Sequence, residues 1–398
     1  MAGDPLLCLC VPCKVGVTRK GVQPAVDQFW RGACLAFACQ PRTTGRMTPR
    51  QAQLEEVVAH TEWVDDAGIA TLRAFLCQSN HETLSPVLRQ RRTFLISYID
   101  AIDAVYGPAV EGPNGAIARP LRCVYARVRE GRLFCRAHVG PSWSKKERSF
   151  ICAQGMPGVL RPFLMRQWAH DIDIENCHVV LLYQLGRCYH AWQENAGKNV
   201  APLQLPELQR LHDNREEFIE HISTVHRLRS DGEAGVGYRK SMCKPLLLRI
   251  LYGGTYDAWL QEHDLFFSGR SPRVVRLQQE VAVLSDAFLR SERFSPIVRA
   301  ERVAQRQRLG QQVARSTFSK IGQYLECEVL LSMRRYFLES GWDVHSLIFD
   351  GLTVAHRADT PLDLRAVAAF VELDTQFVVR VTEKPLFGVT PSCDTLLA

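Results

Sequence analysis

The stretch DIDIENCH at residues 171–178 decides the fold, and the apolar run VVLLY at residues 179–183 follows it at once. The pattern predicts a strand over residues 171–175 that leads into a helix. Asp171 and Asp173 then stand at the edge of an element, facing a cleft. Magnesium prefers such hard oxygen ligands. The alternative is that these acidic residues are solvated or cap the next helix.

A second segment, RKSMCKPLLLRILYGG at residues 239–254, carries the cationic groups. Four of its residues recur every fourth position and so share one face of a helix: Lys240, Lys244, Leu248 and Tyr252. Two lysines one turn apart can bind a triphosphate, and an aromatic ring can stack on a base. Pro245 would kink this helix, unless the helix begins near it. A surface amphipathic helix with exposed lysines is the alternative.

The third segment is HSLIFDGLTV at residues 345–354, where Asp350-Gly351 separates two apolar runs. Such a pair is first of all a tight hairpin turn. The functional interpretation is that the turn holds Asp350 beside Asp173. Two carboxylates placed in this way can bind two metal ions about 3.5–4 Å apart for displacement at phosphorus.

The remaining pattern predicts an α+β fold, in which a long helical insertion interrupts a layer of strands and helices. We expect a hairpin at 122–127 and 132–138 around Glu130-Gly131, and strands at 343–349 and 352–356 that turn at Asp350-Gly351. A final strand is expected at 377–382. Expected helices are 54–59, 67–77, 92–105, then most of 179–339 (206–226 and 316–339 being the clearest), and 362–373.

These elements suggest four parts of the chain. Residues 1–115 form a mostly helical, cysteine-containing region without an assigned role, which a cluster of Gly, Pro and Asn at 107–115 closes. Residues 116–178 and 316–398 contribute the strands, and residues 179–315 form the helical insertion. The cysteines of the first part are buried free thiols, or they hold a zinc ion: Cys8, Cys10, Cys13, Cys34 and Cys39.

The composition fits an ordinary soluble globular protein, because 46% of the 398 residues are hydrophobic and 23% are charged. No run of 18 apolar residues is present, so no membrane span is expected. Fourteen cysteines without a secretory signal favour a reducing, intracellular compartment, the nucleus or the cytoplasm. The net charge of +7 permits a nucleic-acid partner. Seven arginines between residues 290 and 315 form either a solvated helix face or a surface that follows phosphates.

The ordered trio resembles motifs A, B and C of right-hand nucleic-acid polymerases. The second segment is similar to the fingers helix of family A DNA polymerases, and the eight residues from Lys244 to Tyr252 match that family's spacing. The first segment also resembles a family B motif, with Asp173, Asn176 and His178 at its conserved places. The whole looks most like divergent family A-like polymerases of large viruses, phages and protists, which also makes a viral or mobile-element origin conceivable. The resemblance covers roughly residues 161–384.

The resemblance implies a right-hand palm with a helical fingers insertion and a metal centre in the palm. Asp173 and Asp350 would be the ligands of two Mg²⁺ ions, with Mn²⁺ as a substitute. Asp171 is a spare carboxylate that could replace Asp173. Gly351 departs from the family pattern, since a second acid usually follows the aspartate there.

The resemblance also implies a nucleotide-binding set. Lys244 would contact the triphosphate and protonate the leaving pyrophosphate, and Lys240 would bind the same phosphates as a point charge. Tyr252 would lie against the templating base. His178 and Leu248 would influence the choice between ribose and deoxyribose.

The function that follows is a template-directed, DNA polymerase-like nucleotidyltransferase that uses a two-metal mechanism. Its partners would be primer-template DNA and dNTPs, with RNA as an alternative. Two other functions stay open: a primase or RNA polymerase on the same palm, and an inactive palm protein that only binds nucleic acid. The sequence predicts no oligomeric state.

Overall fold

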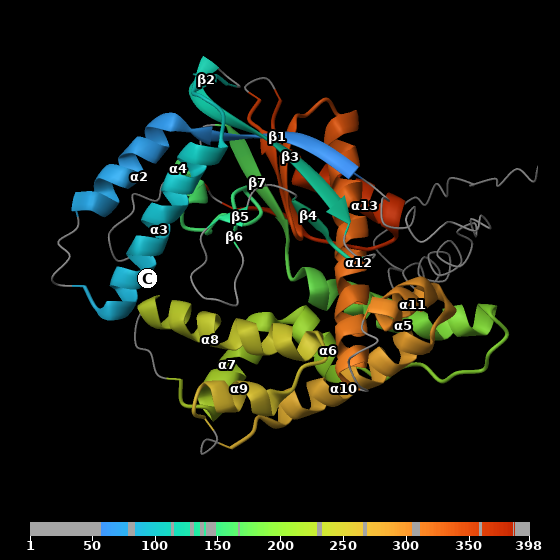
Figure 1. Cartoon of the computed structure of the whole chain (residues 1–398). Helices are drawn as coiled ribbons and strands as arrows, with labels where there is room; N and C mark the ends of the chain where they lie inside the picture. The colour runs from blue at the N-terminus through green and yellow to red at the C-terminus, as the bar shows by residue number, and fades with distance from the viewer. Residues whose placement is uncertain are drawn as a thin grey trace, which may run out of the picture.

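The computed structural model shows an α+β architecture of small antiparallel sheets and many helices (Figure 1). In Figure 1 the larger sheets lie above the helices α6 to α10, and the long helix α12 runs past both groups. The α+β class expected from the sequence is therefore confirmed. The structure describes residues 57–78, 84–112, 115–127, 131–135, 139–140, 149–165, 168–228, 233–265, 269–304, 311–357, 360–384 and 386. The expected N-terminal cysteine cluster lies outside these residues.

The sheet that carries the decisive stretch has four strands in the order β10-β7-β9-β8. Their bounds are Ala169–Ile174 for β7, Val344–Ile348 for β8, Gly351–Ala355 for β9 and Val381–Lys384 for β10. All neighbours are antiparallel, and every residue of β8 and β9 is buried. The strands expected at 171–175, 343–349 and 352–356 are confirmed, whereas the last strand begins later than residue 377.

The turn between β8 and β9 falls on Phe349 and Asp350, so the turn expected at Asp350-Gly351 was one residue too late. Phe349 takes a left-handed conformation with φ of 56°. Gly351 is already a strand residue and pairs with Asp173. A Cβ atom at residue 351 would lie 2.4 Å from the carbonyl oxygen of Ile172 and 2.9 Å from Asp173 Oδ1. The glycine is therefore required by the close approach of β9 to β7.

The second sheet combines residues from both sides of the boundary expected at residue 115. Strand β3 (Ile117–Arg127) pairs with β1 (Val57–Asp65), β2 (Val110–Glu111) and β4 (Leu133–Cys135). The hairpin predicted around residues 130–131 is confirmed by the β3–β4 pairing. Residues 57–65 continue directly into helix α2, and the boundary lies inside this sheet.

The helix expected at 54–59 is wrong where the structure describes it, because residues 57–65 form β1. Four alternate positions point inward: Val58, His60, Glu62 and Val64 are all buried. This is a period of two. Two of these four residues are polar, so the pattern of hydrophobic residues in the sequence does not show the alternation.

Gln154 joins the two larger sheets through its buried side-chain amide. Its Oε1 accepts from the backbone of Cys135 at 2.9 Å, and its Nε2 donates to Leu133 O at 2.9 Å. The same nitrogen lies 3.4 Å from the carbonyl oxygen of Leu347 in β8. Gln154 follows a small hairpin, β5 (Val139–Gly140) with β6 (Ser149–Phe150), and precedes the short helix α4 (Arg161–Leu164).

The helices fall into three sets. Beside the second sheet are α2 (Asp66–Gln78) and α3 (Pro86–Val105). The insertion after β7 contains α5 (Cys177–Asn195), α6 (Pro206–Asp213), α7 (Arg215–Val225), α8 (Glu233–Leu251), α9 (Tyr256–Glu262), α10 (Pro272–Arg290), the 3₁₀ turn η4 (Glu292–Phe294) and α11 (Ser295–Ala304). The last set is α12 (Gln311–Glu339) and α13 (Leu364–Thr375).

One expected helix, 206–226, is interrupted. Asn214 ends α6, and its side chain caps α7 by accepting from Glu217 N at 3.1 Å. Asparagine favours such caps over helix interiors because its side chain competes for backbone hydrogen bonds. No described helix has both the length and the apolar character that crossing a bilayer requires.

The close approach at Gly351 gives a testable expectation. Gly351→Ala should lower the free energy of unfolding by about 1–3 kcal/mol, because the added methyl group collides with backbone of β7. The matched control is Gly158→Ala, since nothing lies within 4 Å of a Cβ atom there. Urea denaturation of both variants measures the difference, and equal stability of the two would contradict the packing described here.

Candidate active site

Sheet pairing places Asp173 and Asp350 side by side although 177 positions separate them. Asp173 in β7 is opposite Gly351 in β9, and the amide of Ile174 donates to the carbonyl oxygen of Asp350 at 3.2 Å. Residues opposite each other in antiparallel strands have Cα atoms about 4.5–5.5 Å apart. Asp173 and the residue preceding its partner are therefore neighbours at the end of the sheet.

The electrostatics of Asp350 show that the two carboxylates interact. The pKa of Asp350 is raised to about 6. Burial is the main cause, and the negative charges of Asp173 and Glu326 contribute to the rise. When neighbouring negative charges raise the pKa of a carboxyl group, nearby positive charge does not fully compensate its ionised form. Asp350 is therefore an acidic group whose ionised form is incompletely compensated at this end of the sheet.

Lys384 supplies one positive charge to the site. Its Nζ lies 2.6 Å from Asp173 Oδ2, and half of its side chain is exposed. The structure places Lys384 on the neighbouring strand β10, opposite Asp171.

Asp171 lies on the same face of β7 as Asp173 but has a different partner. Its Oδ2 lies 3.3 Å from an Nη atom of Arg161, and its residue is 4% exposed. Burial raises the pKa of Asp171, which the charge of Arg161 partly opposes. The residue opposite it in β9 is Thr353, not the turn. Of the two candidate carboxylates, Asp173 is therefore the one beside Asp350.

Glu326 on α12 is the acidic residue that the sequence did not assign to the site. It is fully buried, and its Oε2 lies 2.6 Å from Arg132 Nη2 and 3.0 Å from His178 Nε2. Burial alone would raise the pKa of Glu326, but the His178 hydrogen bond and the Arg132 charge outweigh it and lower the pKa. Glu326 is therefore an anion close enough to influence Asp350.

Glu326 also connects two residues expected to bind the nucleotide. The Tyr252 hydroxyl lies 2.9 Å from His178 Nε2 and 3.4 Å from Arg132 Nη2, and the His178 and Tyr252 rings meet edge-on with centroids 5.0 Å apart. The sequence carries only a weak signal that Glu326 is buried, because a single polar residue on a long helix is usually exposed. Only the convergence of α12, α5, α8 and the residue before β4 makes it an interior group.

The backbone conformation at Asn176 determines the position of His178. Asn176 takes a left-handed conformation with φ of 51°, which asparagine tolerates better than most residues, and α5 begins directly after it. Its side chain accepts from Arg215 at 2.7 Å. The sharp turn sets His178 in the first turn of α5, next to the end of β7.

Helix α8 runs through Pro245, so the expected alternative that it begins near Pro245 is wrong. Pro245 and Ser241 are both exposed, and water can satisfy the carbonyl oxygen that loses its helical partner. Tyr252 follows the last helical residue and still donates its amide to Leu248 O at 3.0 Å. The face shared by Lys240, Lys244 and Tyr252 is therefore continuous.

The two lysines of α8, Lys240 and Lys244, form no ion pair with Asp173 or Asp350 within the described residues. Lys240 Nζ pairs with Glu216 of α7 at 3.2 Å, beside a shallow hollow between α7 and α8. Lys244 is exposed, and within the described ranges no acidic residue pairs with it. Leu248 is partly buried. The structure thus unites Asp173, Asp350, His178 and Tyr252, while Lys240 and Lys244 stand further along α8.

Asp173 and Asp350 are the residues of this site that could hold a divalent metal ion. Asp173 and Asp350 offer hard oxygen donors at an edge where the pKa of Asp350 is raised by uncompensated negative charge. The side chain of Lys384, which pairs with Asp173, is half exposed. No family model matches the chain, and no curated protein matches it.

The raised pKa of Asp350 predicts a pH-dependent effect on stability. Without metal, the folded state binds this proton more tightly than the unfolded state, so stability falls as pH rises from 3.8 to about 6. Asp350→Asn removes that charge and should raise the free energy of unfolding at pH 7.5 by on the order of 2 kcal/mol. At pH 4 the variant and the wild type should differ little. Urea denaturation in chelator measures this, and an Asn variant less stable at pH 7.5 would contradict it.

The Glu326 network predicts a contrast between two neighbouring residues. Glu326→Gln leaves Arg132 buried without its anion and should cost about 3 kcal/mol of unfolding free energy. Glu328→Gln, two positions along α12, removes a partly exposed ion pair with Arg127 and should cost about 1 kcal/mol or less. Thermal and urea denaturation of both variants compare the two costs; similar costs would show that Glu326 is not the buried anchor.

Proposed function

We propose that the protein is a template-directed nucleotidyltransferase of the DNA polymerase type, built on a right-hand palm. In this proposal the β10-β7-β9-β8 sheet is the palm and the helices between β7 and α12 are the fingers. The observation that carries it is the adjacency of Asp173 and Asp350, whose mutual repulsion contributes to the raised pKa of Asp350.

The order of the elements supports the same function. Strand β7, which carries Asp171 and Asp173, leads into a helical insertion with a lysine-bearing helix, and the chain then returns through β8 to β9, which pairs with β7. Asp173 and Asp350 would hold Mg²⁺ or Mn²⁺, which supplies charge neutralisation and lowers the pKa of an attacking hydroxyl. Lys384 neutralises Asp173 when that ion is absent.

Helix α8 provides the nucleotide contacts. Lys244 and Tyr252 are eight residues apart, which corresponds to about 12 Å along a helix, a span that one nucleoside triphosphate can bridge. Tyr252 is fixed at the sheet end through its hydroxyl, and Lys244 is exposed. Lys244 then binds the triphosphate and donates a proton to the departing pyrophosphate, and Lys240 adds a second positive charge once it leaves Glu216.

His178 and Tyr252 form the floor of the proposed nucleotide site. Burial raises the pKa of the Tyr252 hydroxyl, so it stays protonated and keeps its hydrogen-bond partners at neutral pH. His178 is buried between Tyr252 and Glu326 and cannot change rotamer without breaking both contacts. A rigid group in this place limits the room beside the sugar, which is the basis for choosing dNTPs or NTPs. A primase or RNA polymerase on the same palm is the variant of this proposal that accepts NTPs.

One observation favours a second candidate, a palm protein that binds nucleic acid without catalysis. The ion pair between Lys384 and Asp173 occupies one of the two carboxylates. The raised pKa of Asp350 argues against this candidate, because perturbed pKa values cluster at functional sites.

Primer extension on a DNA template tests the proposal. With Mg²⁺ and dNTPs the wild type should extend the primer, and Asp173→Asn and Asp350→Asn should each lower the rate about 100-fold or more while template binding is kept. Asp257→Asn is the control, since this aspartate is half exposed on α9 and pairs with Arg270. Lys244→Ala should raise the KM for dNTPs and lower kcat.

The nucleotide dependence separates the candidates. Incorporation of NTPs in preference to dNTPs would identify the primase or RNA polymerase variant. Template binding without extension by the wild type, in Mg²⁺ and in Mn²⁺, would overturn the catalytic proposal in favour of the binding protein.

A further inference from the structure

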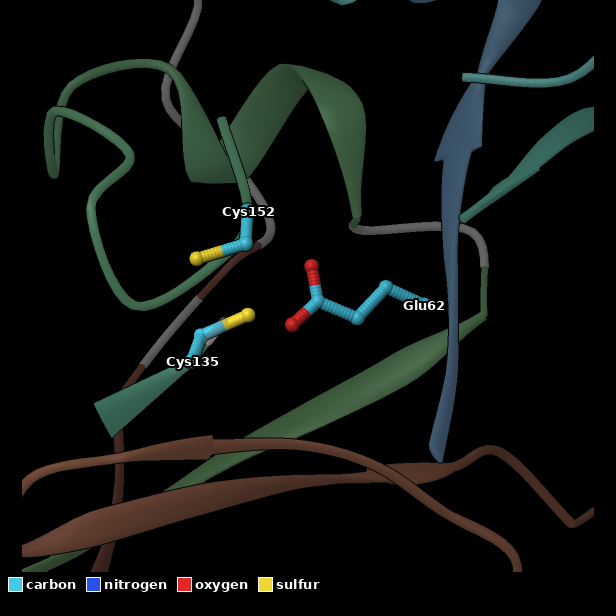
Figure 2. A group of neighbouring side chains, drawn as sticks. All are labelled: Glu62, Cys135 and Cys152. Carbon is cyan, nitrogen blue, oxygen red and sulfur yellow. The ribbon is translucent and has the colours of Figure 1, made fainter. Parts of the chain in front are cut away.

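A second group of potential ligands lies in the interior of the protein. Glu62 on β1, Cys135 on β4 and Cys152 after β6 each offer an atom within 4.8 Å of the others, and all three residues are buried (Figure 2). Figure 2 shows the Glu62 carboxylate directed into the space between the two thiols. Cys123 on β3 is also fully buried and lies within hydrogen-bonding reach of both Glu62 and Cys135. Three thiols and one carboxylate therefore converge.

The hydrogen bonds to Glu62 suit an anion. The Tyr125 hydroxyl donates to Oε1, while the Tyr106 hydroxyl at 3.2 Å and the amide of Ala153 at 2.7 Å donate to Oε2. Together with the Cys123 thiol, these donors lower the pKa of Glu62, but burial outweighs them and raises it.

A buried anion needs positive charge. Glu62 is 0% exposed, and in the described part of the chain no lysine, arginine or histidine forms an ion pair with it. Isolated buried charges are very costly, which is why such groups are paired or coordinate metals. Burial instead favours the protonated form of Glu62. A cation held between this carboxyl group and the neighbouring thiols would allow the ionised form.

The geometry points to a structural zinc site formed by Glu62, Cys123, Cys135 and Cys152. Thiolates select zinc over the hard cations, and four protein ligands in a closed interior are typical of structural sites. Zinc–sulfur bonds of about 2.3 Å in a tetrahedron separate the sulfurs by about 3.8 Å. The ligand atoms of Glu62, Cys135 and Cys152, which lie within 4.8 Å of one another, therefore need to close by about 1 Å at most, and Cys123 would complete the set.

The position of the site indicates what zinc does there. It would tie β1, β3 and β4 to the segment after β6, and that segment includes Gln154, which bonds to β8 of the other sheet. Arg132, which pairs with Glu326, directly precedes β4. Zinc at this site thus holds the hairpin from which Arg132 reaches the proposed active site, although its presence does not depend on the proposed function.

Zinc content tests the inference. The full chain, purified under reducing conditions with zinc and then desalted, should retain zinc by mass spectrometry of the metal. The Cys135→Ser/Cys152→Ser variant should hold one equivalent less per chain than the wild type. Cys243→Ser is the control, because Cys243 is equally buried but lies on α8 beside Ser223. Equal zinc in the wild type and the double variant would overturn the inference.

Two further variants test the site if the double variant does not fold. In the first, serine replaces the cysteines at 8, 10, 13, 34 and 39. This variant should still bind one equivalent of zinc per chain, which separates the proposed site from the N-terminal cysteines. Glu62→Gln keeps the shape but loses the charge, and should weaken zinc binding at least about 10-fold in competition with a chelator. A wild type without zinc, loss of all zinc from the five-serine variant, or unchanged affinity in Glu62→Gln would each refute the site.

Discussion

The pairing of β7 with β9 is the constraint on which the rest of the structure depends. It brings Asp173 opposite Gly351 and so delivers Asp350 to the end of the same sheet. The pairing works only because residue 351 has no side chain, since a Cβ atom would lie 2.4 Å from a carbonyl oxygen of β7. The glycine that removes an acid from the expected motif is thus what lets the remaining two acids meet. The helices between β7 and β8 must therefore end where β9 can pair with β7 in this register.

Glu326 stabilises the arrangement from the interior. Its carboxylate binds Arg132 from the β3–β4 hairpin and His178 from α5, and His178 in turn meets Tyr252 at the end of α8. One buried anion on α12 therefore fixes groups from three other parts of the chain. Its charge also contributes to the raised pKa of Asp350.

Sequence reasoning predicted the local features and missed those that depend on burial. The strand at Asp173, the β3–β4 hairpin and the long helix before β8 follow from periodicity and turn residues. Strand β1 was mistaken for a helix because the polar His60 and Glu62 occupy inward positions, and the interior role of Glu326 was missed because a helix shows its buried face only in the folded state. The turn at Phe349 was displaced by one residue, because steric contact with β7 makes Gly351 a strand residue. The partners Lys384 and Arg161 could not be foreseen, since they come from strands and helices distant in the chain.

The pairing of β1 with β3 has a consequence for dissecting the protein. A fragment that starts after residue 115 would keep every group of the proposed catalytic centre but would strip β3 of the neighbour that covers nine of its eleven residues. A long, exposed strand edge of this kind recruits other chains. Such a minimal fragment would therefore self-associate through β3, and inactivity or precipitation of it would say nothing about the chemistry of the intact chain.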